Sequence, residues 1–533
     1  MSHFALSRRT LLAGAATLLA STALPRFAFA QEAKKGGRLI VAADSEPKNL
    51  NPAIVASNGV FFVASKVIEP LAEATFEGEP APRLATAWEG SADGLSATFT
   101  LRQGVVWHDG KPFTSADVAF SALNVWKPLQ NLGRIVFANL EAAETPDDHT
   151  VVLKFSKPTP FQLIRNALPA VTSVVPKHIY EGTDIATNPA NTALVGTGPF
   201  KLAEYKPGEY YLLAKNENYW GENQPNLDEI LYRVLPDRAA AAGALEAEEI
   251  HLAAFSAVPL ADLARIAQVP GIEVISKGYE ALTYQLVVEI NHRRKELADL
   301  KVRQAIAHAI DRDFVVKTIF LGYGATATGP VPKNALEFFS ADVPTYAFDV
   351  AKANALLDEA GYAKGADGKR FGLKLLPAPY FNETRQFGDY LRQALAEIGI
   401  DAQIVNNDSA AHQKAVYTDH DFDLAVAPPV FRGDPAISTT ILVKSGTPDG
   451  VPFSNQGGYA NPDLDALIDK AAETIDPASR VALYAEFQKK VAEDLPLINV
   501  AEWGFITVAR TSVHNVSNNP RWAVSNWADT WID

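Results

Sequence analysis

The sequence predicts an α/β protein with at least two lobes. Strand-like runs, such as residues 37–43, 150–155 and 283–290, alternate with segments that begin at helix-capping residues, a pattern typical of α/β or α+β lobes. The chain has 533 residues. A single hydrophobic core stops growing at roughly 250–300 residues, so we expect more than one core.

The first thirty residues have the pattern of a twin-arginine export signal. A twin-arginine box, SRRTLL at residues 7–12, precedes an apolar stretch at 11–24 and an A-x-A cleavage site at 28–30. A membrane anchor is the alternative, but the apolar stretch stops at Pro25 and falls short of the ~20 residues of a spanning helix. We therefore expect residues 1–30 to be removed on export.

The composition excludes several classes of function. The formal net charge is −14, and an acidic protein is a poor partner for nucleic acid or an anionic membrane surface. The chain has no cysteine, which excludes disulfides, thiolate metal sites and a lipid-modified N-terminal cysteine. We expect a periplasmic protein without a direct membrane anchor.

Helix boundaries can be read from capping residues. Asp349 opens a helix that Gly361 closes, and Asn461 and Asp476 each stand before a proline at the first helical position. A helix beginning near residue 300 has an apolar stripe, formed by Val302, Ile306 and Ile310.

The segment 84–118 has the clearest local structure. Residues 98–101 alternate polar and apolar as a half-buried strand, and Gln103-Gly104 breaks this run before a second short strand. Asp109-Gly110 is expected to form a turn. Thr114 with Asp117 makes a variant capping box for the next helix, which Lys127-Pro128 ends.

The sequence of residues 101–118, LRQGVVWHDGKPFTSADV, resembles the signature of the bacterial extracellular solute-binding proteins of family 5, the peptide- and nickel-binding type. Further matching motifs are VGTGPF at 195–200, NYW at 218–220, LKVRQAI at 300–306 and GYANPDLD at 458–465. The resemblance extends over nearly the whole chain after the signal.

The resemblance implies a large two-lobed periplasmic-binding-protein fold of the cluster C type, with an extra domain inserted in the first lobe. The first lobe would consist of residues 31–75, 196–290 and 501–533, the inserted domain of 76–195, and the second lobe of 291–500. Hinge strands are expected near residues 289–291 and 499–502.

The implied function is capture of a small solute, a peptide or peptide-like compound, between two closing lobes. The protein would be a monomer without cofactors that delivers its ligand to an ABC permease and its ATPase subunits. A secreted hydrolase that uses carboxylates in the cleft is the alternative class. The sequence does not support this alternative, because it lacks the G-x-S-x-G, H-E-x-x-H and phosphate-loop motifs. His108-Asp109 fits a structural turn better than a catalytic pair.

Chelated nickel is an alternative ligand within the same fold. The histidines after the signal form no His-x-His cluster, and His412 and His420 are expected to be exposed. The cluster of Glu248, Glu249 and His251 is expected to cover a solvated helix end rather than hold a metal.

The loop at residues 427–435, APPVFRGDP, corresponds to the loop that holds the ligand in peptide-binding relatives. In those relatives an aspartate neutralises the ligand's ammonium and a tryptophan covers it; this chain has Phe431 and Pro428 at these positions. Since a buried ammonium without an anionic partner costs several kcal/mol, the departure is serious. Asp434 is expected to shape the turn and is also a candidate ligand contact.

Two arginines could hold an acidic group of a ligand. Arg432 is in the same loop, and Arg385 lies at the start of a helix, where dipeptide-binding relatives place a carboxylate-holding arginine. The alternative is that both arginines pair with surface acids. The pattern favours an acidic or neutral ligand head, as in an acidic peptide derivative, an opine-like conjugate or an oligosaccharide. The complete set of candidate ligand-binding residues is Arg385, Arg432, Phe431, Asp434, Asn58, Phe61, Tyr380, Asn382 and Trp503.

Overall fold

The computed structural model describes residues 33–55 and 57–533. The predicted export signal, residues 1–30, lies outside this part of the chain. Residues 35–533 form one unit by their backbone contacts. Among the described residues, no helix combines the length and the apolar character needed to cross a membrane.

The first sheet is built from three distant parts of the chain. The central strand β1 pairs in parallel with β10 and β11, and the other pairings in this sheet are antiparallel. Alternate side chains such as Leu39 and Val41 point into the core of this sheet. The sheet order is β12 (Ile272–Ile275), β20 (Thr507–Arg510), β11 (Leu252–Ala253), β1 (Arg38–Ala43), β10 (Glu229–Val234), β9 (Tyr210–Lys215) and β8 (Phe200–Lys206).

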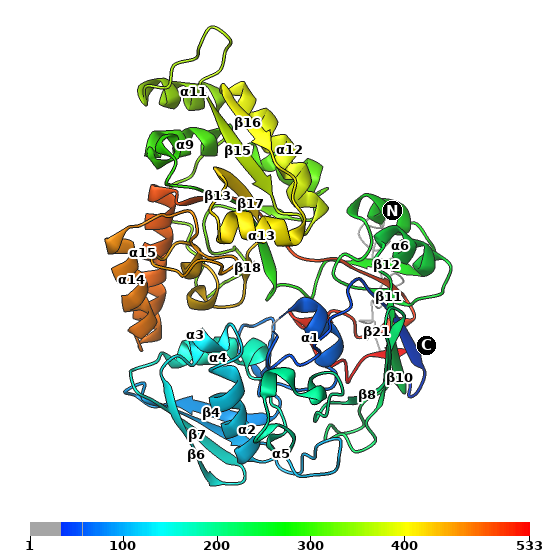
Figure 1. Ribbon diagram of the computed structural model, residues 1–533. Helices are drawn as coiled ribbons and strands as arrows, with labels where there is room; N and C mark the ends of the chain where they lie inside the picture. Colours follow the sequence, from blue (N-terminus) through cyan, green and yellow to red (C-terminus); the bar gives the residue numbers. More distant parts are fainter. Residues whose placement is uncertain (1–32, 56) are drawn as a thin grey trace, which may run out of the picture. The chain divides into compact units, whose positions relative to one another are not determined.

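The second sheet is also mixed, and α12 lies alongside its strands β15 and β16 (Figure 1). Its order is β14 (Ala325–Thr326), β19 (Leu497–Trp503), β13 (Thr283–Ile290), β17 (Leu424–Ala427), β15 (Phe371–Pro377) and β16 (Ile400–Ile404), and β18 (Val430–Phe431) pairs with the first half of β13. The strand predicted at 283–290 is therefore confirmed.

A third, antiparallel sheet lies in the segment between β1 and β8. Its order is β4 (Ala85–Gly90), β5 (Ser96–Leu101), β7 (Thr150–Phe155) and β6 (Leu140–Asp147). The strand predicted at residues 98–101 and the turn at Asp109-Gly110 are confirmed. The predicted second short strand after Gly104 is reduced to one bridge between Val106 and Pro112. Two small pairs complete the strands, β2 (Ala72–Glu73) with β3 (Ala81–Pro82) and β21 (Val513–His514) with β22 (Trp531–Ile532).

The predicted helix caps are confirmed. The carboxylates of Asp349 and Asp476 and the amide oxygen of Asn461 accept hydrogen bonds from backbone N–H groups of the first turns they precede. The Asp117 carboxylate accepts from the N–H of Thr114 at 2.9 Å. The main helices are α1 (Asn58–Ala64), α2 (Ser115–Ser121), α4 (Phe161–Val171), α6 (Arg238–Glu246), α9 (Leu300–Ala309), α11 (Val350–Glu359), α12 (Asn382–Glu397), α13 (Ser409–Tyr417), α14 (Pro462–Glu473) and α15 (Pro477–Asp494).

Shorter helices fill the connections. A π-helical turn at Ala122–Trp126 extends α2 up to the predicted end at Lys127-Pro128. The other short helices are α3 (Gly133–Val136), α5 (Lys177–Tyr180), α7 (Leu263–Ile266), α8 (Lys295–Ala298), α10 (Arg312–Phe314), a π-helical turn at Val315–Ile319, and 3₁₀ turns at Ile185–Thr187, Pro189–Asn191, Leu260–Asp262, Pro435–Ile437, Thr440–Leu442 and Trp522–Val524.

The chain crosses between the first and second sheets twice. It passes from β12 to β13 through residues 276–282, and it returns from β19 to β20 through residues 504–506. The expected crossings near 289–291 and 499–502 fall instead within β13 and β19 or at their ends. These two strands pair with each other along most of their length, which keeps them together in the second sheet.

The VGTGPF motif is a site of close backbone packing. A Cβ at Gly196 would lie 1.7 Å from the carbonyl oxygen of Val67, so only glycine fits there. The His108 ring is held against the same motif, with Nε2 3.0 Å from the Gly198 oxygen and Nδ1 3.3 Å from the Gly196 nitrogen. Burial lowers the pKa of His108 to about 4, so the ring is neutral at pH 7 and links the two turns through these hydrogen bonds.

Candidate functional site

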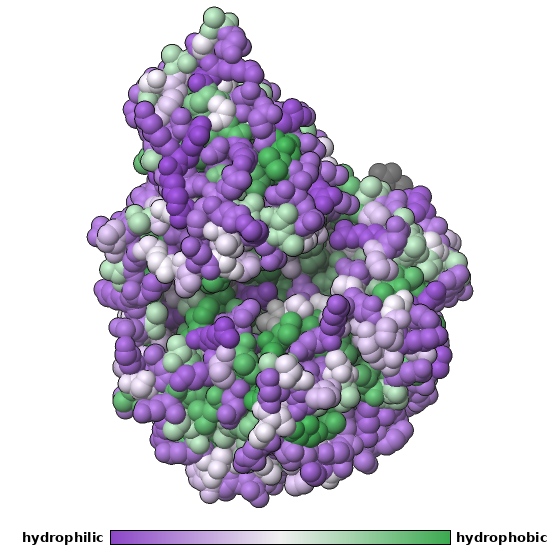
Figure 2. Space-filling view, in the orientation of Figure 1, coloured by the Kyte–Doolittle hydropathy of each residue, from purple (hydrophilic) through white to green (hydrophobic). Residues whose placement is uncertain are grey.

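A cavity of about 540 Å³ lies where segments of all three sheet regions meet. Its lining comes from the β2–β3 loop, from α4, from the 276–282 crossing, from a loop before α11, from the loop after β18 and from the C-terminal segment. The face shown in Figure 2 is hollowed across its middle, and hydrophobic residues cover part of the hollow. The volume falls within the range of about 300–1,000 Å³ that is usual for small-molecule sites.

Apolar side chains form much of the cavity wall. Phe76, Pro80, Pro169, Leu336 and Phe338 all line it. Leu336 is 81% exposed, so its side chain is accessible to a solute. These walls suit the apolar part of a solute.

Two arginines lie at the polar part of the lining, Arg432 from the loop after β18 and Arg521 from the C-terminal segment. Arg521 is 6% exposed, and its guanidinium carbon lies 5.7 Å from the centre of the Phe61 ring. Within residues 33–55 and 57–533, neither guanidinium has a hydrogen bond or an ion pair with protein. Burial lowers the pKa of both groups, and the positive charge of Arg432 lowers that of Arg521 further.

None of the acidic residues that line the cavity forms an ion pair with Arg432 or Arg521 in the described part of the chain; these residues are Glu77, Glu79, Glu280 and Glu337. Glu79 and Glu337 each form an ion pair with Arg165 at 2.8 Å. One carboxylate oxygen of Glu280 accepts a hydrogen bond from the Gly278 N–H at 2.9 Å. The polar part of the cavity therefore carries two positive charges without a protein counter-ion among the described residues.

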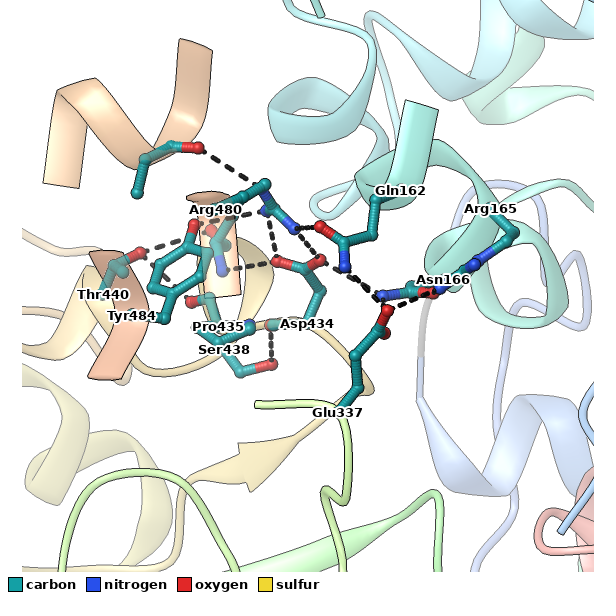
Figure 3. A network of polar contacts seen from close by, with 12 residues as sticks. Gln162, Arg165, Asn166, Glu337, Asp434, Pro435, Ser438, Thr440, Arg480 and Tyr484 are labelled. Atoms are coloured by element: carbon teal, nitrogen blue, oxygen red, sulfur yellow. Dashed lines mark hydrogen bonds and ion pairs between the residues drawn. The ribbon is translucent and has the colours of Figure 1, made fainter. Parts of the chain in front are cut away.

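Asp434 does not line the cavity. Its two oxygens each lie 2.7 Å from a guanidinium nitrogen of Arg480, and both side chains have an exposed fraction of 0% (Figure 3). It also accepts from the Ala436 N–H at 2.9 Å and so caps the 3₁₀ turn that follows. The turn-shaping role expected for Asp434 is what the geometry shows, and its carboxylate has no capacity left for a ligand.

The polar network around Asp434 joins α4 to the second sheet region (Figure 3). The Gln162 side chain accepts from Arg480 at 3.1 Å and donates to Glu337 at 2.7 Å. Asn166 donates to Glu337 at 3.0 Å and lies 3.4 Å from Asp434. This network fixes the wall of the cavity beside Arg165.

Of the predicted site residues, Phe431 and Arg432 line the cavity, whereas Arg385, Asn382 and Tyr380 do not. Thr384 and Phe387 are buried on α12, so Arg385 turns to the opposite, exposed face of that helix. The Tyr380 ring packs against His412 instead. The cavity thus includes only one of the two arginines that the sequence suggested for an acidic group.

Asn58, Phe61 and Trp503 lie at the junction between the first and second sheet regions. Asn58, at the start of α1, donates to the Tyr284 hydroxyl of β13 at 3.0 Å. Trp503 packs against Tyr284 with ring centres 5.4 Å apart. None of the three lines the 540 Å³ cavity. Phe61 lies behind the lining, since its ring packs against the guanidinium of Arg521, which does line the cavity.

Sequence reasoning missed Arg521 and Glu502. Arg521 stands in no motif and follows Pro520 in the tail. Glu502 lies in β19 beside a second hollow of about 340 Å³, where one of its oxygens is buried without a hydrogen-bond partner. Burial raises the pKa of Glu502 to about 7. The signal for both residues is their burial, which only the tertiary structure reveals.

The described residues contain no group of three or more His, Asp or Glu side chains arranged to hold a metal ion. His420 contacts Asp449 at 3.2 Å. The expectation that His412 is exposed was wrong: it is 1% exposed, because its face of α13 packs against Tyr380.

Two mixed sheets joined by two crossings, with a cavity lined from both, are the architecture of a solute-binding protein. The chain belongs to the bacterial extracellular solute-binding proteins, family 5: the model of the family's middle region matches residues 79–473. This confirms the family and the α/β fold that the sequence motifs indicated.

Named relatives agree with this assignment. The chain is 27% identical over 490 residues to the dipeptide-binding protein of Escherichia coli K12, covering 87% of this chain and 89% of the relative. It is 29% identical over 426 residues to the glutathione-binding protein of Salmonella typhi, covering 78% and 79%. Among solved structures, the binding protein AgaA of A. tumefaciens R10 in complex with agropinic acid has a TM-score of 0.75 at 27% identity, covering 93% of this chain and 99% of that one.

Proposed function

We propose that this protein is the periplasmic solute-binding component of an ABC importer, which captures a peptide or peptide-like solute and delivers it to a membrane permease. The observation that carries this proposal is the 540 Å³ cavity lined from all three sheet regions. A dipeptide, glutathione and agropinic acid, the ligands named for the relatives, are all small polar solutes. Binding, rather than catalysis, is the role we assign to the site.

In this proposal the sheet regions act as lobes. We assign residues 33–75, 196–282 and 504–533 to the first lobe, 76–195 to the inserted domain and 283–503 to the second lobe, with the crossings at 276–282 and 504–506 as the hinge. A ligand that contacts both lobes stabilises the closed arrangement by the difference between its affinities for the closed and open forms. The protein would act as a monomer, after export through the twin-arginine signal.

Native mass spectrometry of the purified protein tests this function. We expect a stoichiometric small molecule that is released unchanged on denaturation. Ala281→Trp would fill part of the cavity and should abolish retention, whereas Ala351→Trp, at an exposed position of α11, should retain the solute. Equal retention by both variants would place the ligand elsewhere, and chemical conversion of the solute would indicate a hydrolase.

A further inference from the structure

Arg521 is exceptional among the buried arginines of the described chain. Four arginines have an exposed fraction of 9% or less, namely Arg303, Arg480, Arg510 and Arg521. Arg480 and Arg510 form ion pairs with Asp434 and Glu248. Arg303 donates to the carbonyl oxygens of Leu297, Ala298 and Asp494 at 2.8 to 2.9 Å. Arg521 alone among the four lacks such a partner.

Arg432 adds a second positive charge without a counter-ion among the described residues. It comes from the loop after β18 of the second sheet, whereas Arg521 comes from the tail and packs on Phe61 of α1 beside the first sheet. Both residues line the same cavity, and the charge of Arg432 lowers the pKa of Arg521. Arg521 is buried and Arg432 is half-buried, so leaving both positive charges without a counter-ion is costly, and no contact within the described protein offsets this cost.

We propose that Arg432 and Arg521 together bind an oxyanion of the ligand, a carboxylate, phosphate or sulfonate, at the junction of the two sheet regions. This inference rests on the proposed function and specifies its substrate class: an acid with an apolar body that lies against Phe76, Pro169 and Phe338. Each guanidinium presents several planar N–H donors, which match the oxygens of such a group.

The position of the pair also couples binding to closure. Without an anion, the two charges repel each other across the junction and favour separation of the sheet regions. With an anion between them, each arginine gains a counter-ion and the same pair holds the regions together. Phe431 is compatible with this arrangement, because an aspartate at this position would place a carboxylate next to Arg432.

Titration with sodium sulfate tests the pair without knowledge of the natural ligand. Sulfate affinity is measured by calorimetry at constant ionic strength set with sodium chloride. We expect Arg432→Gln and Arg521→Gln to weaken sulfate binding by at least about tenfold, a change typical of losing one charge-assisted hydrogen-bonding group. Arg385→Gln, which removes an exposed arginine outside the cavity, should bind sulfate like the unaltered protein.

Thermal unfolding without sulfate separates this role from a structural one. Removal of an unpaired buried charge should leave the melting temperature of Arg521→Gln unchanged or raise it, whereas a packing role would lower it. Arg521→Lys keeps the charge and should retain part of the sulfate affinity. Absence of sulfate binding to the unaltered protein, or equal binding by all variants, would overturn the inference.

The two proposals fail in different ways. A neutral or cationic solute that is retained equally by Arg432→Gln and Arg521→Gln would overturn the oxyanion site and leave the carrier function intact. Sulfate binding that depends on both arginines, in a protein that converts its solute, would support the oxyanion site and remove the carrier function.

Discussion

Asp434 and Arg480 form a bidentate salt bridge in which neither side chain is exposed to solvent. Arg480 lies in α15, and Asp434 caps the turn that follows the cavity loop. The pair therefore anchors the loop that carries Phe431 and Arg432 to a long helix of the second sheet region. An aspartate suggested by sequence as a ligand contact is instead part of the support of the site.

Breaking this salt bridge should destabilise the protein strongly. Arg480→Met leaves the Asp434 carboxylate buried and unpaired, and we expect a loss of about 3–5 kcal/mol in the free energy of unfolding. The double variant Asp434→Leu with Arg480→Met removes both charges and should lose less than the sum of the single variants. Urea denaturation measures all three. Single losses below about 1 kcal/mol would contradict the structural role.

Gly196 should not tolerate a side chain. The Cβ of Gly196→Ala would lie 1.7 Å from the Val67 carbonyl oxygen, so the backbone must shift, at a cost of about 1–3 kcal/mol. Gly243→Ala is the matched control, because Gly243 is exposed in α6 and a Cβ there has no atom within 4 Å. It should stabilise the protein by up to about 1 kcal/mol. Similar effects of both variants would refute the packing argument.

Glu502 should make stability depend on pH. Its pKa in the folded protein is about 7, above the ordinary value of 4.5, so the folded state binds the extra proton between these values. The stabilisation from this proton is complete below about pH 4.5 and is lost as pH rises through 7. Unfolding free energies of Glu502→Gln and the unaltered protein should diverge by about 3 kcal/mol between pH 4.5 and pH 8, with the variant the more stable at pH 8.

The outcome that would contradict this prediction is a difference between Glu502→Gln and the unaltered protein that is the same at pH 4.5 and pH 8. It would show that Glu502 is not the titrating group.

The hydrogen bond from Asn58 to Tyr284 should couple α1 to the second sheet. A double-mutant cycle of Asn58→Ala and Tyr284→Phe should give a coupling of about 0.5–1.5 kcal/mol in unfolding experiments. Tyr205→Phe is the comparison, since its hydroxyl donates to Glu46 away from β13. It should show no coupling to Asn58→Ala, and coupling of equal size in both cycles would contradict a direct bond.

Local structure was predicted well where a few adjacent residues determine it. The caps at Asp349, Asn461 and Asp476 and the strand at 283–290 are as predicted, because a capping side chain bonds to its own first turn and strand alternation is a property of consecutive residues. The family motifs likewise predicted the fold, which the family model and the solved relatives confirm.

The composition of the site could not be predicted in this way. Arg385 was suggested by its place at a helix start, yet the rotation of α12 against its sheet directs it to solvent. Arg480, which forms the salt bridge with Asp434, lies 46 positions further along the chain. Sequence spacing contains no information on either relationship.

The sequence by itself determined the family, the capped helices, the main strands and the loop that carries Arg432. Only the tertiary structure decided that Arg432 and Arg521 line the same cavity and that Asp434 forms a buried salt bridge with Arg480. Capping and alternation act over a few residues of one segment, whereas the burial and pairing of a charge depend on which distant segments pack around it.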